Sequence, residues 1–197
     1  MNTTDYYARC CFSEEQLDAL RQLYYKYFDP KMPETYAGYG VAAFWRDSSY
    51  PNAEDKAFDP NGGVQGFNAG DAMKDPLWNV FADLLPYMDE SAIITKMTAW
   101  KNMAPHIDRE WRPEAIYFPI DGCSSECVST YYENGSKVGS FAVEGNAYLT
   151  NVHKMHAVMN KGTHTRIAFG WNFKSPSMTF SDCYNILSDL GYLEKQD

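Results

Sequence analysis

Short apolar or alternating runs dominate the chain after residue 90. They read AIITKMTAW, AIYFPI, CVSTYY, KVGSFAV, NAYLTNV and RIAFGWNF, and turn residues separate them. Runs of this length and spacing are typical of β-strands. Asn134–Gly135 lies between two of them and predicts a hairpin turn, because both residue types tolerate a positive φ. Asp121–Gly122 and residues 160–162 mark further turns. The pattern predicts a β-sandwich or barrel over about residues 91–175.

Helical spacing appears before this β-rich part. Apolar residues three or four apart predict a first helix; they are Leu17, Leu20, Leu23 and Tyr24. Ser13 followed three residues later by Gln16 resembles a capping box at its start, and Asp29–Pro30 is expected to end it.

Two further helices are expected. One covers about residues 76–87, with an apolar face made by Leu77, Val80, Phe81 and Leu84. The other covers about residues 181–190 and is expected to be capped by Ser181. Residues 31–75 are rich in Gly, Pro, Asn and Asp and predict a long irregular connection, either a lid over a site or a surface excursion. We expect one domain, 1–197, whose helical and loop part spans about residues 1–90.

The composition is that of a folded, acidic protein. Apolar residues make up 45% of the 197 residues and aromatic residues 16%, which is enough to build a core. The net charge is −9 and Lys and Arg form no cluster, which disfavours nucleic acid and anionic membranes as partners. No apolar run reaches membrane-spanning length, and the first residues lack the pattern of a secretory signal, so we expect a cytoplasmic protein. No pattern indicates an oligomeric state.

The cysteines indicate a reducing compartment. There are five, an odd number, and Cys10 and Cys11 are adjacent, which makes them poor disulfide partners. Cys123 and Cys127 lie four apart, but no second cysteine pair completes a zinc site. We therefore interpret them as ordinary thiols.

The candidate chemistry begins with His106 and Asp108 in the sequence Pro-His-Ile-Asp. On a strand, residues two apart point to the same face, so an imidazole and a carboxylate could occupy neighbouring positions on one metal ion. A second histidine from a distant strand would complete a site of two histidines and one carboxylate, which suits Fe(II). A surface turn in which the aspartate accepts a hydrogen bond from the histidine is the alternative.

His156 and Arg166 form the second signal. They lie ten residues apart across a turn-like segment, which predicts neighbouring antiparallel strands. Arg166 should share a strand face with Ala168 and Gly170, whose small side chains leave room for a ligand, and its guanidinium can grip a dicarboxylate. An outward-pointing arginine is the alternative. His164 lies beside a glycine turn and is disfavoured as a ligand.

At these residues the chain resembles the 2-oxoglutarate/Fe(II)-dependent dioxygenase superfamily, in particular its prolyl-hydroxylase-like and aspartyl-hydroxylase-like branches. The resemblance spans about residues 90–175 and rests on PHIDREWRPEAIYFPI and NVHKMHAVMNKGTHTRIAFGWNF. It implies a mainly β fold with flanking helices, in which N-terminal helices pack on a double-stranded β-helix, also called a jelly roll or cupin-like core.

The resemblance also implies a site. Fe(II) would be bound by His106, Asp108 and His156. Arg166 would pair with the distal carboxylate of the co-substrate 2-oxoglutarate, and Tyr117 would touch the same molecule. Many members of the superfamily carry Ser or Thr two residues after this arginine, whereas this chain has Ala168. His153 could be a pocket residue, and the pocket could be lined by Trp100, Trp111 and Trp171.

The implied activity is hydroxylation of a small-molecule or peptide substrate, with 2-oxoglutarate converted to succinate and CO2. A peptidyl residue, a free amino acid and another small metabolite are all open as substrates. Two alternatives remain: a cupin-like metalloenzyme that does not use 2-oxoglutarate, and a non-catalytic β-sandwich binding module in which His106 and Asp108 are structural.

Overall fold

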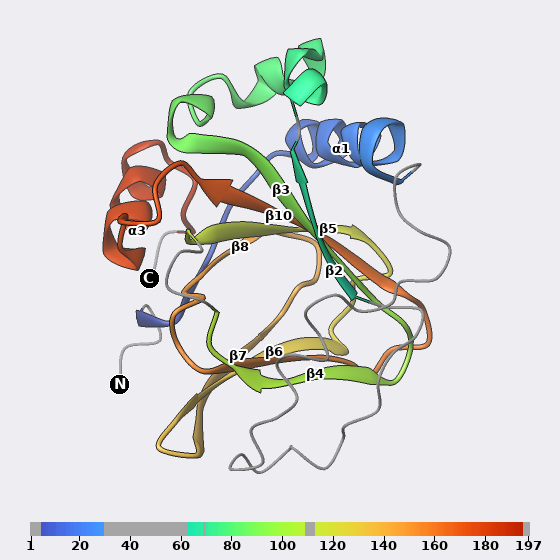
Figure 1. The fold of residues 1–197 in the computed structure, drawn as a ribbon, viewed down its shortest axis with the longest axis vertical. Helices are drawn as coiled ribbons and strands as arrows, with labels where there is room; N and C mark the ends of the chain where they lie inside the picture. The colour runs from blue at the N-terminus through green and yellow to red at the C-terminus, as the bar shows by residue number, and fades with distance from the viewer. Residues whose placement is uncertain (1–4, 30–62, 69, 109–112, 195–197) are drawn as a thin grey trace.

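Two antiparallel β-sheets face each other in the computed structural model, which describes residues 5–29, 63–68, 70–108 and 113–194 (Figure 1). The larger sheet has the order β1-β8-β5-β10-β3-β2, with β1 (Tyr7–Arg9), β2 (Gly63–Asn68), β3 (Met88–Met97), β5 (Ala115–Asp121), β8 (Tyr148–Thr150) and β10 (Arg166–Phe173). The smaller sheet has the order β4-β9-β6-β7, with β4 (Lys101–His106), β6 (Cys127–Glu133), β7 (Ser136–Ala142) and β9 (His156–Asn160).

The path of the chain between the sheets defines the fold. From β3 to β10 each strand lies in the opposite sheet from the strand before it, except that β6 and β7 form a hairpin within the smaller sheet. The two short strands β1 and β2 add to the edges of the larger sheet. This alternation is a jelly roll, so the predicted fold class is confirmed.

The strands agree closely with the sequence patterns. Each of the six apolar runs contributes one strand, namely β3, β5, β6, β7, β8 and β10. Asn134 and Gly135 have φ values of 50° and 75° and connect β6 to β7, which confirms the hairpin turn. Gly122, after β5, has a φ of 59°, and a Cβ there would lie only 1.9 Å from the carbonyl oxygen of Thr165. Only glycine fits this turn.

The first helix begins where it was predicted. The helix α1 (Glu14–Leu23) starts after Ser13, whose hydroxyl accepts from the Gln16 N–H while the Gln16 side chain accepts from the Ser13 N–H. This is the expected capping box. The helix continues as one π-helical segment, η2 (Tyr24–Phe28).

The second predicted helix is wrong in type. Residues 76–87 form two 3-10 helices, η5 (Pro76–Phe81) and η6 (Leu85–Tyr87), preceded by a third, η4 (Gly70–Lys74). The buried residues are Trp78, Phe81 and Leu84, which lie three apart. A spacing of three matches the 3.0 residues per turn of a 3-10 helix, whereas Leu77 and Val80, assigned to the buried face, are only partly buried.

Two other boundaries also differ from the prediction. The C-terminal helix α3 (Phe180–Asp189) is capped by Thr179, which forms a capping box with Asp182, and Ser181 lies inside it. The segment predicted to be irregular contains β2, which pairs with β3 although two glycines weaken its strand pattern. Residues 31–62 of the expected connection lie outside the described residues. The lid and the surface excursion, the two interpretations of this segment, therefore stay predictions.

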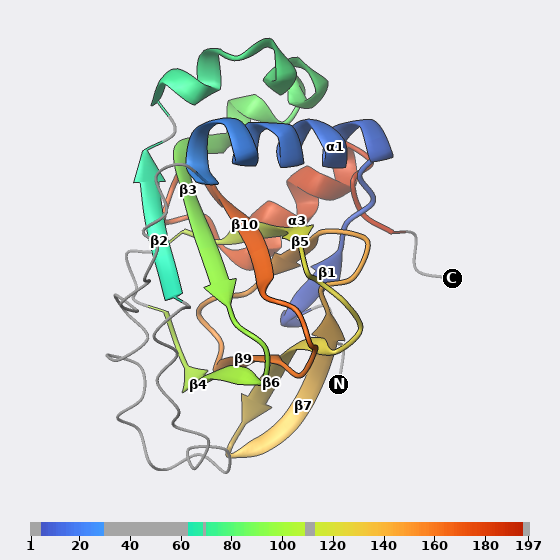
Figure 2. The same cartoon turned by 90° about the vertical axis from the view of Figure 1, so that its right-hand side faces the viewer.

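The main core lies between the larger sheet and the helices. Figures 1 and 2 show α1 and α3 on the side of this sheet that faces away from the smaller sheet. Large aromatic side chains fill the contact, and those that are almost fully buried include Phe28, Trp78, Phe81, Phe118, Phe169 and Trp171. The helices thus cover the outer face of the larger sheet, and its inner face turns towards the smaller sheet.

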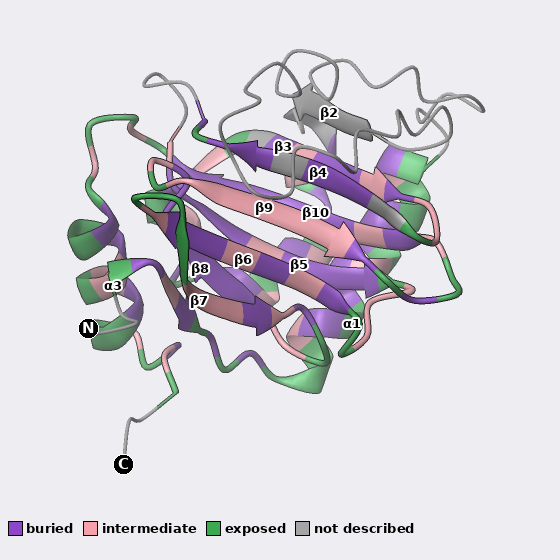
Figure 3. Cartoon of the chain, turned by 90° about the horizontal axis from the view of Figure 1, so that it is seen from below, coloured by how far each residue is buried: buried purple, intermediate pink, exposed green. Residues whose placement is uncertain are grey.

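The inner space between the sheets is where polar residues are buried. In the smaller sheet, β6 alternates between buried and half-buried residues, as expected for a strand with one inward face (Figure 3). Buried polar side chains around this space include Thr95, His106, Asp108 and Arg166. Within the described ranges, no helix is long and apolar enough to cross a membrane.

Candidate metal centre

Two histidines oppose each other across the smaller sheet. His106, the last residue of β4, is the direct partner of His156, the first residue of β9, and their ring centroids lie 4.4 Å apart. A β-bulge in β4 contributes to this arrangement: Met103 pairs with Val158, so three steps along β4 match two along β9. Both Met103 and His106 are therefore buried.

Asp108 joins the two histidines from just beyond the end of β4. The strand was expected to include Asp108, but it ends at His106, and the Asp108 N–H donates to the carbonyl oxygen of Val152 at 3.0 Å. The Asp108 carboxylate is buried, with Oδ1 3.4 Å from Nε2 of His106. One ligand atom from each of the three residues lies within 4.8 Å of the others. The structure brings the three predicted ligands together.

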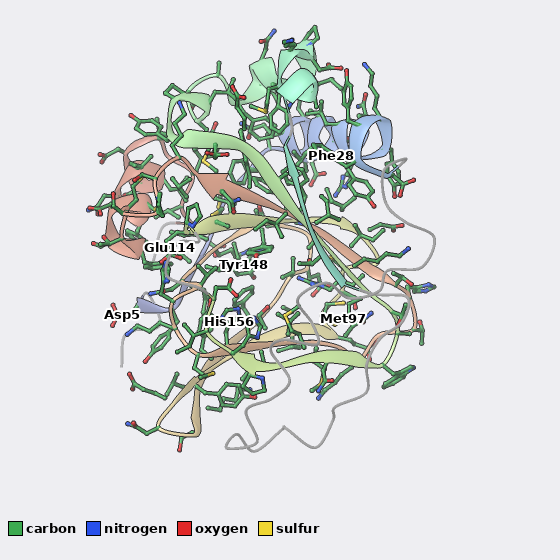
Figure 4. All side chains as sticks on the ribbon, viewed as in Figure 1. Asp5, Phe28, Met97, Glu114, Tyr148 and His156 are labelled. Atoms are coloured by element: carbon green, nitrogen blue, oxygen red, sulfur yellow. The ribbon has the colours of Figure 1, made fainter. Side chains whose placement is uncertain are left out.

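The ring of His156 is held in one tautomer. Its Nδ1 lies 2.8 Å from the carbonyl oxygen of Lys154, which can only accept a hydrogen bond. Nδ1 therefore carries the proton, and the lone pair of the neutral imidazole is on Nε2. Metal-binding histidines commonly use this arrangement, in which one ring nitrogen donates to a carbonyl and the other binds the ion. His156 is half-buried and lies between the two sheets, as does Met97 (Figure 4).

Arg166 lies on the inner face of the larger sheet, at the start of β10. Its side chain is 3% exposed, its Nη1 donates to the Thr95 hydroxyl at 3.4 Å, and its Nε has no hydrogen-bond partner among the described residues. Such a buried donor needs an acceptor, and a carboxylate matches the planar guanidinium best. The expected position on a strand paired with that of His156 is wrong, because β10 and β9 belong to different sheets.

A chain of contacts connects Arg166 to the metal-binding residues. Arg166 is the strand partner of Met97 on β3. Met97 packs against Met103 and Val158. These two residues are partners in the β4–β9 pairing, and His106 and His156 are the next partners along it. The guanidinium and the three candidate ligands therefore share the interior of the jelly roll.

Tyr117 lies on the strand next to the one that carries Arg166. It is half-buried on β5, opposite Gly170 in the strand pairing. A Cβ at Gly170 would lie 2.9 Å from Cε1 of Tyr117, so the ring rests directly on the glycine backbone. The missing side chain of Gly170 thus leaves space that the Tyr117 ring fills.

Two buried residues near the site had not been identified from the sequence. Tyr131 on β6 is the strand partner of His156, with ring centroids 5.7 Å apart. Burial, followed by the negative charge of Glu114, raises the pKa of Tyr131 well above its usual value, so the phenol is neutral. The Glu114 carboxylate accepts from the Val152 N–H at 2.9 Å, and Val152 is the residue that anchors the Asp108 backbone. Both contacts join residues far apart in the sequence, so only the folded structure reveals these neighbours.

Other candidates lie apart from the site. His153 is half-buried, with Nε2 4.0 Å from the Glu114 carboxylate, and His164 is exposed. Trp171 packs in the core against Trp78, and Trp100 is 70% exposed in the β3–β4 turn with a φ of 62°, so neither lines the inner space. Trp111 lies outside the described residues. The cysteines within the described ranges are all free thiols, as predicted.

The comparisons with known proteins identify the fold. No model of a protein family matches the sequence, and no curated protein matches it. A prolyl-4-hydroxylase from Pseudomonas putida has a similar structure, with a TM-score of 0.50 and 14% identity over 85% of this chain and 90% of that one. SnoK, a non-haem alpha-ketoglutarate-dependent carbocyclase from nogalamycin biosynthesis, gives a TM-score of 0.50 and 12% identity over 87% and 80%.

A third structure matches over a shorter stretch. It is an oxidoreductase of the 2OG-Fe(II) oxygenase family from Burkholderia pseudomallei, with a TM-score of 0.40 and 15% identity. The match covers 54% of this chain and 56% of that one, so the chain spans about half the length of this relative. At these identities the similarity concerns the fold. The resemblance to the 2-oxoglutarate/Fe(II) oxygenases is confirmed at that level.

Proposed function

We propose that the protein is a non-haem Fe(II)- and 2-oxoglutarate-dependent oxygenase that hydroxylates a small molecule or a peptide residue, releasing succinate and CO2. One observation carries the proposal: His106, Asp108 and His156 converge within 4.8 Å in the same interior as a buried arginine whose Nε has no hydrogen-bond partner among the described residues. Taken alone, the three candidate ligands could be structural, and a buried arginine could have a role unrelated to a ligand. Together they match a metal ion and a dicarboxylate bound side by side.

The three candidate ligands fit Fe(II). Two imidazole nitrogens and one carboxylate oxygen on one side of a metal leave three positions open, which is the donor set of non-haem Fe(II) oxygenases. The Lys154 carbonyl sets the His156 ring so that Nε2 can bind. The Glu114 carboxylate and the Asp108 backbone hold Val152 from two sides, which fixes the segment that carries the carboxylate ligand.

The inner face of β10 fits 2-oxoglutarate. Arg166 would orient the distal carboxylate through its Nε–H, which has no partner in the described part of the chain, and one Nη–H, a paired geometry that lysine cannot provide. Ala168, two residues from Arg166 on the same strand face, contributes only a methyl group beside the guanidinium, and further along the strand the Tyr117 ring packs on Gly170. The buried, neutral Tyr131 excludes water from the side of His156.

When bound, the iron and 2-oxoglutarate supply the oxidising chemistry, in which O2 activation is coupled to decarboxylation of the co-substrate. The protein contributes binding, orientation and a water-poor interior. Because the site is formed by strands of two packed sheets, the positions of its side chains are set by the fold itself. A cytoplasmic location and one domain over residues 1–197 are part of the same proposal.

The test is a visible spectrum recorded without oxygen. Fe(II) and 2-oxoglutarate are added to the metal-free protein, and we expect a weak charge-transfer band from the chelated keto acid. His156→Ala should abolish the band. Arg166→Ala should need a much higher concentration of 2-oxoglutarate to give the same band intensity. The exposed His164 and Arg9 serve as matched controls, and His164→Ala and Arg9→Ala should leave the spectrum unchanged.

Either of two results would overturn the proposal. Metal binding without the band would indicate a cupin-like metalloenzyme that does not use 2-oxoglutarate. Failure to bind metal at all would indicate that the three residues are structural and that the fold serves as a binding module.

A further inference from the structure

We infer that the Thr95 hydroxyl, on β3, donates a hydrogen bond to the distal carboxylate of 2-oxoglutarate and so replaces the hydroxyl that position 168 lacks. The inference rests on the proposed function and adds to it a binding residue that the sequence motif does not contain. It is carried by the strand register and by the contacts of Thr95 with Arg166 and Ala168.

Thr95 lies where a hydroxyl from position 168 would be needed. Thr95 and Ala168 are direct partners in the β3–β10 pairing. The Cβ atoms of direct antiparallel partners are about 5 Å apart and point to the same face of the sheet. Thr95 therefore shares the inner face with Arg166 and Ala168, although more than 70 residues separate it from them in the sequence.

The hydroxyl is already close to the guanidinium. Thr95 is 8% exposed and Arg166 is 3% exposed, so both polar groups are removed from solvent. The Thr95 hydroxyl oxygen accepts from Arg166 Nη1 at 3.4 Å. A carboxylate that pairs with Arg166 would consequently lie within reach of this hydroxyl as well.

The hydroxyl proton has only a weak partner at present. Thr95 Oγ1 lies 3.4 Å from the Ala168 carbonyl oxygen, well beyond the usual 2.7–2.8 Å for a hydrogen bond between oxygens. A hydroxyl proton can rotate to another acceptor without moving the oxygen. A buried carboxylate is a much stronger acceptor than this carbonyl, because the bond is charge-assisted. Ligand binding would therefore replace the weak hydrogen bond from the Thr95 hydroxyl to the Ala168 carbonyl with a stronger one to the carboxylate.

The experiment compares two keto acids without oxygen. Wild type, Thr95→Val, Thr95→Ala and Thr95→Ser are loaded with Fe(II) and titrated with 2-oxoglutarate or with pyruvate, and the charge-transfer band gives the Kd. Pyruvate offers the same chelating group to the metal but has no distal carboxylate. Its Kd therefore reports whether the metal-binding part of each variant is intact.

The expected result is a split between the two ligands. Thr95→Val and Thr95→Ala should raise the Kd for 2-oxoglutarate about tenfold, since a hydrogen bond to a buried charge is lost. Their Kd for pyruvate should stay within about twofold of wild type. Thr95→Ser keeps the hydroxyl and should bind both ligands nearly as wild type does.

The opposite results separate this inference from the proposed function. If Thr95→Val and Thr95→Ala bind 2-oxoglutarate as tightly as wild type, or lose both ligands equally, Thr95 is not a carboxylate-binding residue and only the inference fails. If wild type itself shows no saturable band with 2-oxoglutarate, the oxygenase proposal fails, and the inference with it.

Discussion

Asn160, at the end of β9, ties several segments together through one buried amide. The side chain is fully buried. The two N–H groups of its Nδ2 are shared among three main-chain carbonyl oxygens, those of Met97, Thr98 and His164, at 3.0, 3.1 and 2.8 Å. Its Oδ1 accepts from the Gly162 N–H at 3.0 Å and the Cys127 thiol at 3.4 Å. The end of β3, the start of β6 and the turn before Arg166 thus meet at this residue.

The structure gives a magnitude for removing the amide. In Asn160→Ala, at least two donated hydrogen bonds are lost at about 1 kcal/mol each, and the buried Gly162 N–H loses its acceptor at about 1–3 kcal/mol. The free energy of unfolding should fall by about 3–5 kcal/mol. Asn160→Asp has nearly the same shape but should destabilise at least as much at neutral pH, because a carboxylate would face three carbonyl oxygens with no proton to donate.

Urea unfolding of wild type and the two variants measures this effect. Asn79→Asp is the matched control, because it makes the same chemical change at an exposed residue and should alter the unfolding free energy by less than about 0.5 kcal/mol. The reasoning is refuted if Asn160→Asp is less destabilising than Asn160→Ala, or if both lose less than about 1 kcal/mol.

Three other predictions concern single residues. Arg166→Lys keeps the charge but not the paired donors, so the Kd for 2-oxoglutarate should rise at least about tenfold in the anaerobic titration. Gly170→Ala would place a methyl group 2.9 Å from the Tyr117 ring and should lower the unfolding free energy by about 1–3 kcal/mol, measured in urea. Hydrogen bonds, first of all from Lys26, lower the pKa of Asp75 to about 2, so its carboxylate stabilises the fold above pH 4 and this stabilisation is lost as the pH falls through 2. The Tm difference between wild type and Asp75→Asn should therefore shrink between pH 4 and pH 2, and a constant difference would contradict it.

Local patterns predicted the parts of the fold that depend on local interactions. The capping box of Ser13 and Gln16 and the turn at Asn134–Gly135 are formed by residues close together in the sequence, and both were located to the residue. The stretch from Pro76 to Tyr87 was misassigned because apolar residues there can be read with either a three- or a four-residue spacing. Packing of Trp78, Phe81 and Leu84 selects the 3-10 form.

The site was predictable only in part, for a similar reason. His106, Asp108 and His156 could be identified from spacing and residue type, and the structure brings them together. Thr95 could not be identified, because its place beside Arg166 depends on how β3 and β10 are paired. The assumption that His156 and Arg166 lie on paired strands was wrong because the connection between β9 and β10 crosses from one sheet to the other.

The β-bulge in β4 makes the length of this strand as important to the site as its residue types. In a regular strand, Met103 and His106 would point in opposite directions, because they are an odd number of residues apart. Deleting one residue between them would remove the bulge but leave Met103 and His106 two apart, so both would still face inward and His106 would stay opposite His156. Straightening the bulge without a deletion would instead turn His106 outward while leaving every candidate ligand in the sequence. A regular strand of another jelly roll could carry the His-x-Asp motif if its histidine lay an even number of residues from the inward-facing neighbours, whereas in this chain the bulge brings His106 inward at an odd spacing.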